Sequence, residues 1–171
     1  MRHGWIWKAL LCLMLAAGPA HAAELRIVLL GASNENGKGV SPAEAYPAKL
    51  GEMLKAKGIV ADISITARNG ENSRSLLARA DASVPDGTRL VLIGSVRAND
   101  HRSGISQAEH DANRRAIAET LAKRGIRSIA MMYRPLPPDG LQPDGIHLTP
   151  SGHAAVAARI LPEVVAVLRG R

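Results

Sequence analysis

The sequence predicts an α/β fold, a three-layer α/β/α sandwich built on a short parallel sheet of about four strands. Short aliphatic runs alternate with stretches of helical spacing, in the order βαβαβαβα. Such alternation indicates a parallel sheet whose right-handed crossovers place helices on both faces. No repeat, low-complexity segment or long linker interrupts the pattern, so residues 23–171 are expected to form a single domain.

The first elements have clear boundaries in the sequence. The run 25–30 (LRIVLL) has the aliphatic character of a buried parallel strand, and it ends at Gly31. Ser41 and Glu44 form a capping box that predicts a helix beginning there and ending near Gly58.

The middle of the chain repeats this arrangement. Residues 59–66 alternate as a second strand, and a short helix carrying Leu76 and Leu77 follows. The turn signature 85–87 (PDG) precedes a third strand at 89–93. Residues 95–102 are polar and are expected to form a loop.

The last part supplies two helices and one strand. Ser106 and Glu109 form a second capping box, which predicts a helix that runs to Arg124. The fourth strand is expected at 126–133, and the last helix begins after Thr149 and carries Pro162.

The first 22 residues have the pattern of a secretory signal peptide. Arg2 and Lys8 give a positive start, residues 9–17 are apolar but too short to span a bilayer, and the segment 20–22 (AHA) is a cleavage pattern. We therefore expect residues 1–22 to be removed, a mature chain that begins at Ala23, a periplasmic or secreted location, and no stable membrane insertion after cleavage.

Composition excludes some classes of function. Cys12 is the only cysteine, and Trp5 and Trp7 share the signal segment with it, so the mature chain keeps only Tyr46 and Tyr133 as aromatics. Polysaccharide platforms and single-stranded nucleic-acid grooves depend on aromatic stacking. The basic residues behind the net charge of +7 are scattered among acidic ones. No nucleic-acid partner is expected.

Five polar or glycine positions follow the strand ends. They are Ser33, Gly70, Asn99, Asp144 and His147. The loops after parallel strands open on one edge of a sheet, where ligands bind in such folds. These residues are therefore expected to converge although they lie far apart in the sequence.

Their chemistry is complementary. A serine such as Ser33 is a weak nucleophile without a base, and His147 can be that base if Asp144 fixes its tautomer and orientation. The backbone N–H groups of Ser33 and Gly70 and the side-chain amide of Asn99 can act as an oxyanion hole.

Four segments together resemble the sequence blocks of one enzyme family. They are Gly31-Ala32-Ser33, Asn69-Gly70-Glu71-Asn72-Ser73, Asn99-Asp100 and Asp144-Gly145-Ile146-His147. They are similar to the SGNH (GDSL-like) hydrolases, and within them to the thioesterase I/lysophospholipase/arylesterase-type branch. The resemblance implies a flavodoxin-like SGNH hydrolase fold and hydrolysis of esters or thioesters without a metal or other cofactor. It also implies a triad of Ser33, His147 and Asp144, with Gly70 and Asn99 as oxyanion donors.

The chain departs from the family pattern in three places. Ala32 stands where the family has an aspartate that braces the serine loop. Gly94 and Asn99, which belong to one compact block in the family, are separated by four residues. A further strand of many relatives is missing before Asp144. In addition, Glu35 occupies the second glycine position of the Gly-x-Ser-x-Gly elbow of other hydrolases.

The sequence therefore predicts an exported serine esterase that acts on a small-molecule acyl ester or thioester. The alternative is a catalytically impaired binding module of the cell envelope with the same pocket. A metal-dependent nuclease or phosphatase is a third option, although no residues have metal-ligand spacing. Among the other histidines, His110 is expected at the surface, and His153 on a helix face or in a cap.

Overall fold

The computed structural model describes residues 25–170. The predicted signal peptide, with Cys12 and its cleavage site, lies outside the described residues. The described part contains one parallel sheet with the strand order β2-β1-β3-β4. The strands are β1 Leu25–Leu30, β2 Ala61–Ile65, β3 Thr88–Ile93 and β4 Arg127–Ala130. The helices are α1 Tyr46–Ala56, α2 Ser73–Arg79, α3 Arg97–Arg102, α4 Gln107–Lys123 and α5 Pro150–Leu168.

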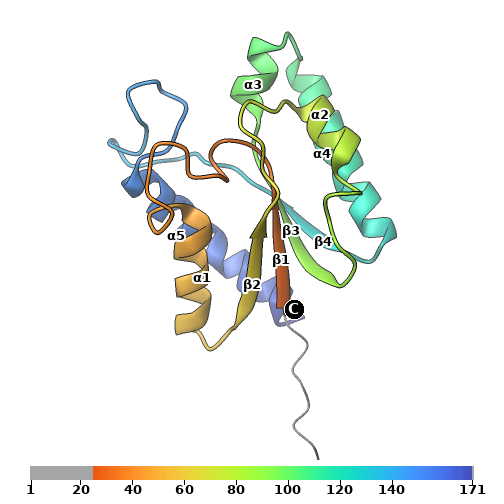
Figure 1. Ribbon diagram of the computed structural model, residues 1–171, viewed down its shortest axis with the longest axis vertical. Coiled ribbons are helices and arrows are strands. Elements are labelled where there is room, and N and C mark those ends of the chain that lie inside the picture. Colours follow the sequence, from red (N-terminus) through yellow and green to blue (C-terminus); the bar gives the residue numbers. More distant parts are fainter. Residues whose placement is uncertain (1–24, 171) are drawn as a thin grey trace, which may run out of the picture.

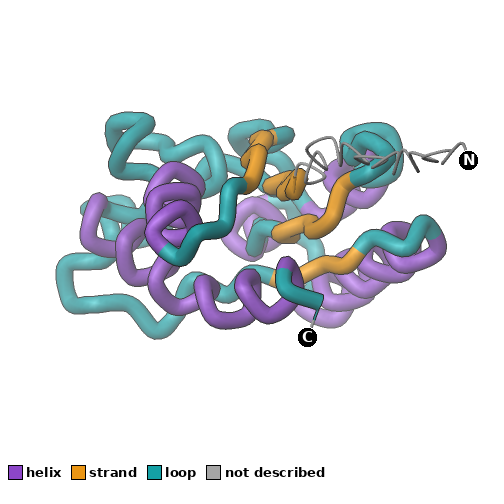
Figure 2. Tube along the Cα trace, turned by 90° about the horizontal axis from the view of Figure 1, so that it is seen from below, coloured by secondary structure: helices purple, strands orange, loops and turns teal. Residues whose placement is uncertain are grey.

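Helices cover both faces of this sheet. Helices α1 and α5 lie together on one side, and α2 and α4 lie together on the other (Figure 1). The view from below shows the strands between the helices (Figure 2). The predicted α/β/α sandwich with a four-stranded parallel sheet is thus confirmed.

Strand β1 connects the two halves of the core. Ile27 and Leu29 belong to the apolar cluster under α1 and α5, whereas Val28 and Leu30 belong to the cluster under α2 and α4. All four side chains are fully buried. A central parallel strand is buried on both faces, which explains the unbroken aliphatic run in the sequence. Each such side chain contributes roughly 1.5–3 kcal/mol by its burial.

Side-chain caps fix the start of three helices. The Ser106 hydroxyl accepts a hydrogen bond from the backbone N–H of Glu109 at the start of α4, and Thr149 does the same for Gly152 at the start of α5. Both caps were predicted and are confirmed. Asn72 caps α2 by accepting from Ser75. Each cap satisfies a backbone donor that has no partner within its helix.

The first helix begins later than predicted, at Tyr46 rather than after Ser41. Ser41 and Glu44 do form the expected contacts, because the Ser41 N–H and hydroxyl both donate to the Glu44 carboxylate. They close a separate turn. A helix continuing from Ser41 would lose a hydrogen bond at Pro47 and would clash with the ring of this proline, which instead occupies the first turn of α1.

Two further segments differ from the expectation. The polar stretch 95–102 contains the short helix α3 instead of a loop. Strand β4 ends at Ala130 rather than at residue 133, because Ala130 pairs with Ile93, the last residue of β3. Beyond Ile93 the chain leaves the extended conformation, so β4 has no neighbouring strand with which to pair.

Helix α5 is long and apolar enough to cross a bilayer by length and composition. Its apolar residues instead pack in the core: Val156, Ile160 and Val164 join the cluster that contains Ile27 and Leu29. Within this structure α5 is therefore a core helix.

Candidate active site

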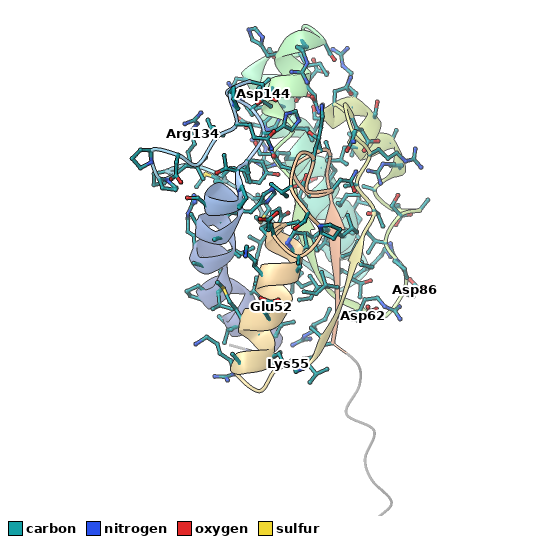
Figure 3. All side chains as sticks on the ribbon, turned by 60° about the vertical axis from the view of Figure 1, so that its left-hand side comes forward. Glu52, Lys55, Asp62, Asp86, Arg134 and Asp144 are labelled. Carbon is teal, nitrogen blue, oxygen red and sulfur yellow. The ribbon has the colours of Figure 1, made fainter. Side chains whose placement is uncertain are left out.

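A cavity of about 470 Å³ opens at the carboxyl ends of the strands. Ser33, Asn99 and Tyr133 line it, together with apolar side chains that include Leu141 and Ile146. Figure 3 shows Asp144 and Arg134 toward the upper end of the molecule, to which the strands run, whereas Glu52, Lys55, Asp62 and Asp86 lie toward the opposite end. The strand-end loops thus meet at one edge of the sheet, as the parallel topology requires.

Ser33, His147 and Asp144 form one continuous hydrogen-bonded array. The Nε2 atom of His147 lies 2.9 Å from the Ser33 hydroxyl, and Nδ1 lies 2.5 Å from the Asp144 carboxylate. Since Asp144 accepts from the Nδ1–H, the Nε2 atom is free to accept from Ser33. Ser33 and His147 are 8% and 7% exposed, so little water competes for these bonds.

The Asp144 carboxylate is fixed by its own loop. The backbone N–H groups of Ile146 and His147 both donate to one of its oxygens at 2.9 Å, and the imidazole binds the other. The hydrogen bonds from the His147 side chain, from the His147 N–H and from the Ile146 N–H hold the pKa of Asp144 well below its usual range. Asp144 therefore stays an acceptor and keeps the imidazole in one tautomer.

Asn34 joins the serine loop to the histidine loop, a role that sequence reasoning missed. Its side-chain oxygen accepts from the Leu148 N–H at 3.1 Å, and its amide donates to the Ile146 carbonyl at 3.4 Å. These bonds bracket His147. The only signal in the sequence was the position of Asn34 directly after Ser33.

Asn99 lies on α3, is 6% exposed and lines the cavity. Its side-chain amide donates to the Glu71 carbonyl at 2.7 Å, and its side-chain oxygen accepts from Arg102. An amide nitrogen carries two hydrogens, so one N–H remains for a ligand. Of the four residues between Gly94 and Asn99, the last two form the first positions of α3, and this helix places Asn99 at the cavity.

Gly70 has a φ of +80°, the left-handed conformation that glycine adopts without steric penalty. It is exposed, and it is not among the residues that line the cavity. Its neighbour Glu71 accepts from Asn99, so the loop of Gly70 borders the site. The donor role of Gly70 toward a ligand stays a prediction.

Comparisons with known proteins agree on the architecture. No protein-family model and no curated protein matches the chain. Among solved structures, TesA superposes with a TM-score of 0.73 at 17% identity, covering 83% of this chain and 99% of its own. The psychrotrophic esterase EstA from Pseudoalteromonas sp., inhibited by monoethylphosphonate, superposes with a TM-score of 0.70 at 17% identity over 85% of this chain and 100% of its own. AlinE4, described as an SGNH-hydrolase family esterase, superposes with a TM-score of 0.57 at 28% identity over 82% of this chain and 72% of its own.

This chain has the SGNH hydrolase fold.

Within this SGNH fold, Glu35 supplies a carboxylate close to the position where Ala32 replaces the aspartate of the family pattern. The Glu35 side chain is 1% exposed and accepts a hydrogen bond from the Ala32 N–H at 2.7 Å. The role of this residue was missed from the sequence, where only the glycines that follow β1 and β3 indicated a side chain filling this space. Tyr46 and Tyr133, the only Phe, Tyr or Trp side chains among residues 25–170, both contact Glu35.

The third sequence block of the SGNH fold is braced by a buried pair. Asp100 accepts from the Ser73 N–H at 2.6 Å and contacts Nδ1 of His110 at 2.7 Å. The expectation that His110 lies at the surface was wrong, because this side chain on α4 is 1% exposed. The Asp100 carboxylate on α3 pairs with this buried histidine, and no local pattern in the sequence indicated that contact. The pair fixes α3, and with it Asn99, against α2 and α4.

Within residues 25–170, no group of three or more His, Cys, Asp and Glu side chains could hold a metal ion.

Proposed function

We propose that this chain is an exported serine esterase that hydrolyses carboxylic esters or thioesters of small molecules. The observation that carries the proposal is the array Ser33–His147–Asp144, with distances of 2.9 and 2.5 Å. EstA and AlinE4 are both esterases, which supports the reaction class. A shared fold alone would not fix a function, so the array is the stronger argument.

The reaction begins with attack of the Ser33 oxygen on the carbonyl carbon, while His147 takes the hydroxyl proton at Nε2. The carbonyl oxygen becomes an oxyanion, and the Ser33 N–H, the Gly70 N–H and the free N–H of Asn99 donate hydrogen bonds to it. Collapse breaks the bond to the leaving oxygen or sulfur, which receives the proton from His147. Water then attacks the acyl carbon while His147 takes its proton. The bond between the acyl carbon and the Ser33 oxygen breaks, His147 returns the proton to that oxygen, and the acid leaves.

Asp144 stabilises the imidazolium that forms in both halves of the reaction. Its carboxylate is fixed by two backbone N–H groups and remains ionised, so the positive charge on His147 has a permanent partner. The cavity of about 470 Å³ beside Ser33 suits a small-molecule acyl ester, and its apolar side chains Leu141 and Ile146 suit an acyl group.

The test is hydrolysis of p-nitrophenyl esters from acetyl to decanoyl by the mature protein and by the Ser33→Ala variant. Ser41→Ala is the matched control, because Ser41 is exposed and does not line the cavity. We expect turnover that Ser33→Ala abolishes and Ser41→Ala leaves unchanged. The preferred acyl length then narrows the substrate.

Labelling with an alkyl fluorophosphonate separates the serine nucleophile from the choice of ester. A mass increase on Ser33 in the absence of ester turnover would keep the proposal and point to another acyl substrate. A protein that neither hydrolyses esters nor takes the label would favour the alternative, a binding module with an inactive site.

A further inference from the structure

Glu35 is a buried carboxylate that the proposed reaction does not use. It lies directly beneath the serine loop, between the ends of β1 and β3. A Cβ atom added at Gly31 would lie 2.2 Å from a Glu35 carboxylate oxygen, and one at Gly94 would lie 2.6 Å from the Glu35 carboxyl carbon. Each of these strands is therefore followed by a glycine at the point where this side chain fits.

Both carboxylate oxygens of Glu35 accept hydrogen bonds. One accepts from the Ala32 N–H at 2.7 Å. The other accepts from the Tyr46 hydroxyl at 3.1 Å and from the Tyr133 hydroxyl. The Tyr133 oxygen in turn accepts from the Ser95 N–H at 3.2 Å. The only aromatic residues of the described chain thus meet at one carboxylate.

These hydrogen bonds connect the loops whose relative positions determine the geometry of the site. Ala32 precedes Ser33, Ser95 begins the segment that leads to Asn99, and Tyr133 begins the segment that leads to Asp144. We propose that Glu35 is a positioning residue whose carboxylate holds the Ser33 loop against the Asn99 loop, the task left open by alanine at position 32. This inference rests on the proposed function, since it assigns a role within the same site.

The charge of Glu35 matters for this role. An ionised carboxylate accepts at both oxygens, whereas a protonated one turns one oxygen into a donor and leaves an N–H or O–H unpaired. Burial raises the pKa of Glu35, and the hydrogen bonds from Tyr133, Ala32 and Tyr46 oppose that rise. Arg114, which donates to the Ile93 and Met131 carbonyls, is the nearby cation.

The decisive variant is Glu35→Gln, which keeps the shape of the side chain but places an amide NH₂ opposite an N–H or O–H group that also donates. We expect kcat to fall about 10–100-fold with KM nearly unchanged, because a small displacement of a reacting group costs rates of that order. Phosphonate labelling of Ser33 should slow in parallel. Val164→Ala is the control for lost stability alone, since Val164 is buried in the core on α5 and lies outside the cavity. It should melt earlier and keep the wild-type kcat.

A second pair of variants decides the matter if Glu35→Gln does not fold. Tyr46→Phe and Tyr133→Phe each remove one hydroxyl from the same carboxylate oxygen, but only Tyr133 also binds Ser95. We expect slower labelling for Tyr133→Phe, whereas Tyr46→Phe should chiefly lower thermal stability.

The outcomes separate the two proposals. If the wild type labels and turns over, and both Glu35→Gln and Tyr133→Phe match its rates, the positioning role is overturned and the proposed function stands. If the wild type itself neither labels nor turns over, the proposed function fails first and the positioning role fails with it.

Discussion

The Nε2 atom of His147 lies 2.9 Å from the Ser33 hydroxyl, although 114 positions separate the two residues in the chain. Ser33 follows β1, the central strand, and His147 lies just before α5. Asn34 accepts from the Leu148 N–H, so the contact is held by the residues next to both partners. The fold itself therefore places the His147 imidazole beside the Ser33 hydroxyl.

The Asp144→Asn variant tests how His147 is oriented. An asparagine can present its NH₂ to Nδ1 and so favour the wrong tautomer, and we expect kcat to fall roughly 10³–10⁴-fold. Asp139→Asn is the control, because Asp139 is an exposed carboxylate near the same loop that binds Ser151 instead. Steady-state ester hydrolysis measures both. Equal kcat values for the two variants would remove Asp144 from the mechanism.

The proposed oxyanion role of Asn99 predicts a loss in turnover rather than in binding. Asn99→Ala should lower kcat about 10²–10³-fold with little change in KM. Asn99→Asp, which replaces the donor by an anion of the same shape, should be at least as slow. Asn113→Ala removes an amide that binds Ser73 on α2 and should leave kcat unchanged. A rise in KM at constant kcat would contradict the role.

Gly70→Ala tests whether the backbone N–H of this residue takes part. The φ of +80° makes alanine strained, and we expect a loss of about 1–2 kcal/mol in the free energy of unfolding. Gly87→Ala is closely matched, because its φ is +78° and nothing lies within 4 Å of the added Cβ at either position. Only Gly70→Ala should also lower kcat, about tenfold or more. If both variants kept full turnover, Gly70 would be structural only.

His153 makes stability depend on pH. It is fully buried, its Nδ1 atom accepts from the Tyr46 N–H, and burial lowers its pKa to about 4. Its contribution is complete above the unfolded pKa of about 6.5 and is lost as the pH falls through about 4, a difference of roughly 3 kcal/mol. His153→Asn keeps an acceptor and removes this titration. Urea unfolding between pH 7 and 4 measures the free energy of unfolding of the wild type and of His153→Asn, and the two values should converge as the pH falls. If the two free energies changed with pH in parallel, the role given to His153 would be contradicted.

The proposed export predicts a defined N-terminus. Expression of the full chain in a bacterial host should yield a periplasmic or secreted protein whose first residue is Ala23. Mass spectrometry of the intact protein measures this. Ala22→Arg should block cleavage and leave the longer chain. A soluble protein that keeps residue 1 would show that the segment is no signal peptide.

Local signals in the sequence predicted the fold well. Aliphatic runs marked all four strands, and Ser106 and Thr149 marked two helix starts within one residue. The errors arose where a nearby element overrode the local pattern. Pro47 delayed α1 beyond the capping box at Ser41, and the end of β3 cut β4 short at Ala130.

The sequence by itself determined the α/β architecture and the residue types Ser33, Asp144 and His147, because periodicity, turn residues and a tight Asp-x-x-His loop are local properties of a chain. Only the tertiary structure decided the distance from Ser33 to His147, the burial of His110 and the place of Glu35. Glu35 reads in the sequence as a polar loop residue. Its carboxylate accepts hydrogen bonds from Ala32, Tyr46 and Tyr133 only because β1 and β3 lie side by side and a glycine follows each of them. Contacts between such distant segments leave no periodic pattern in the sequence.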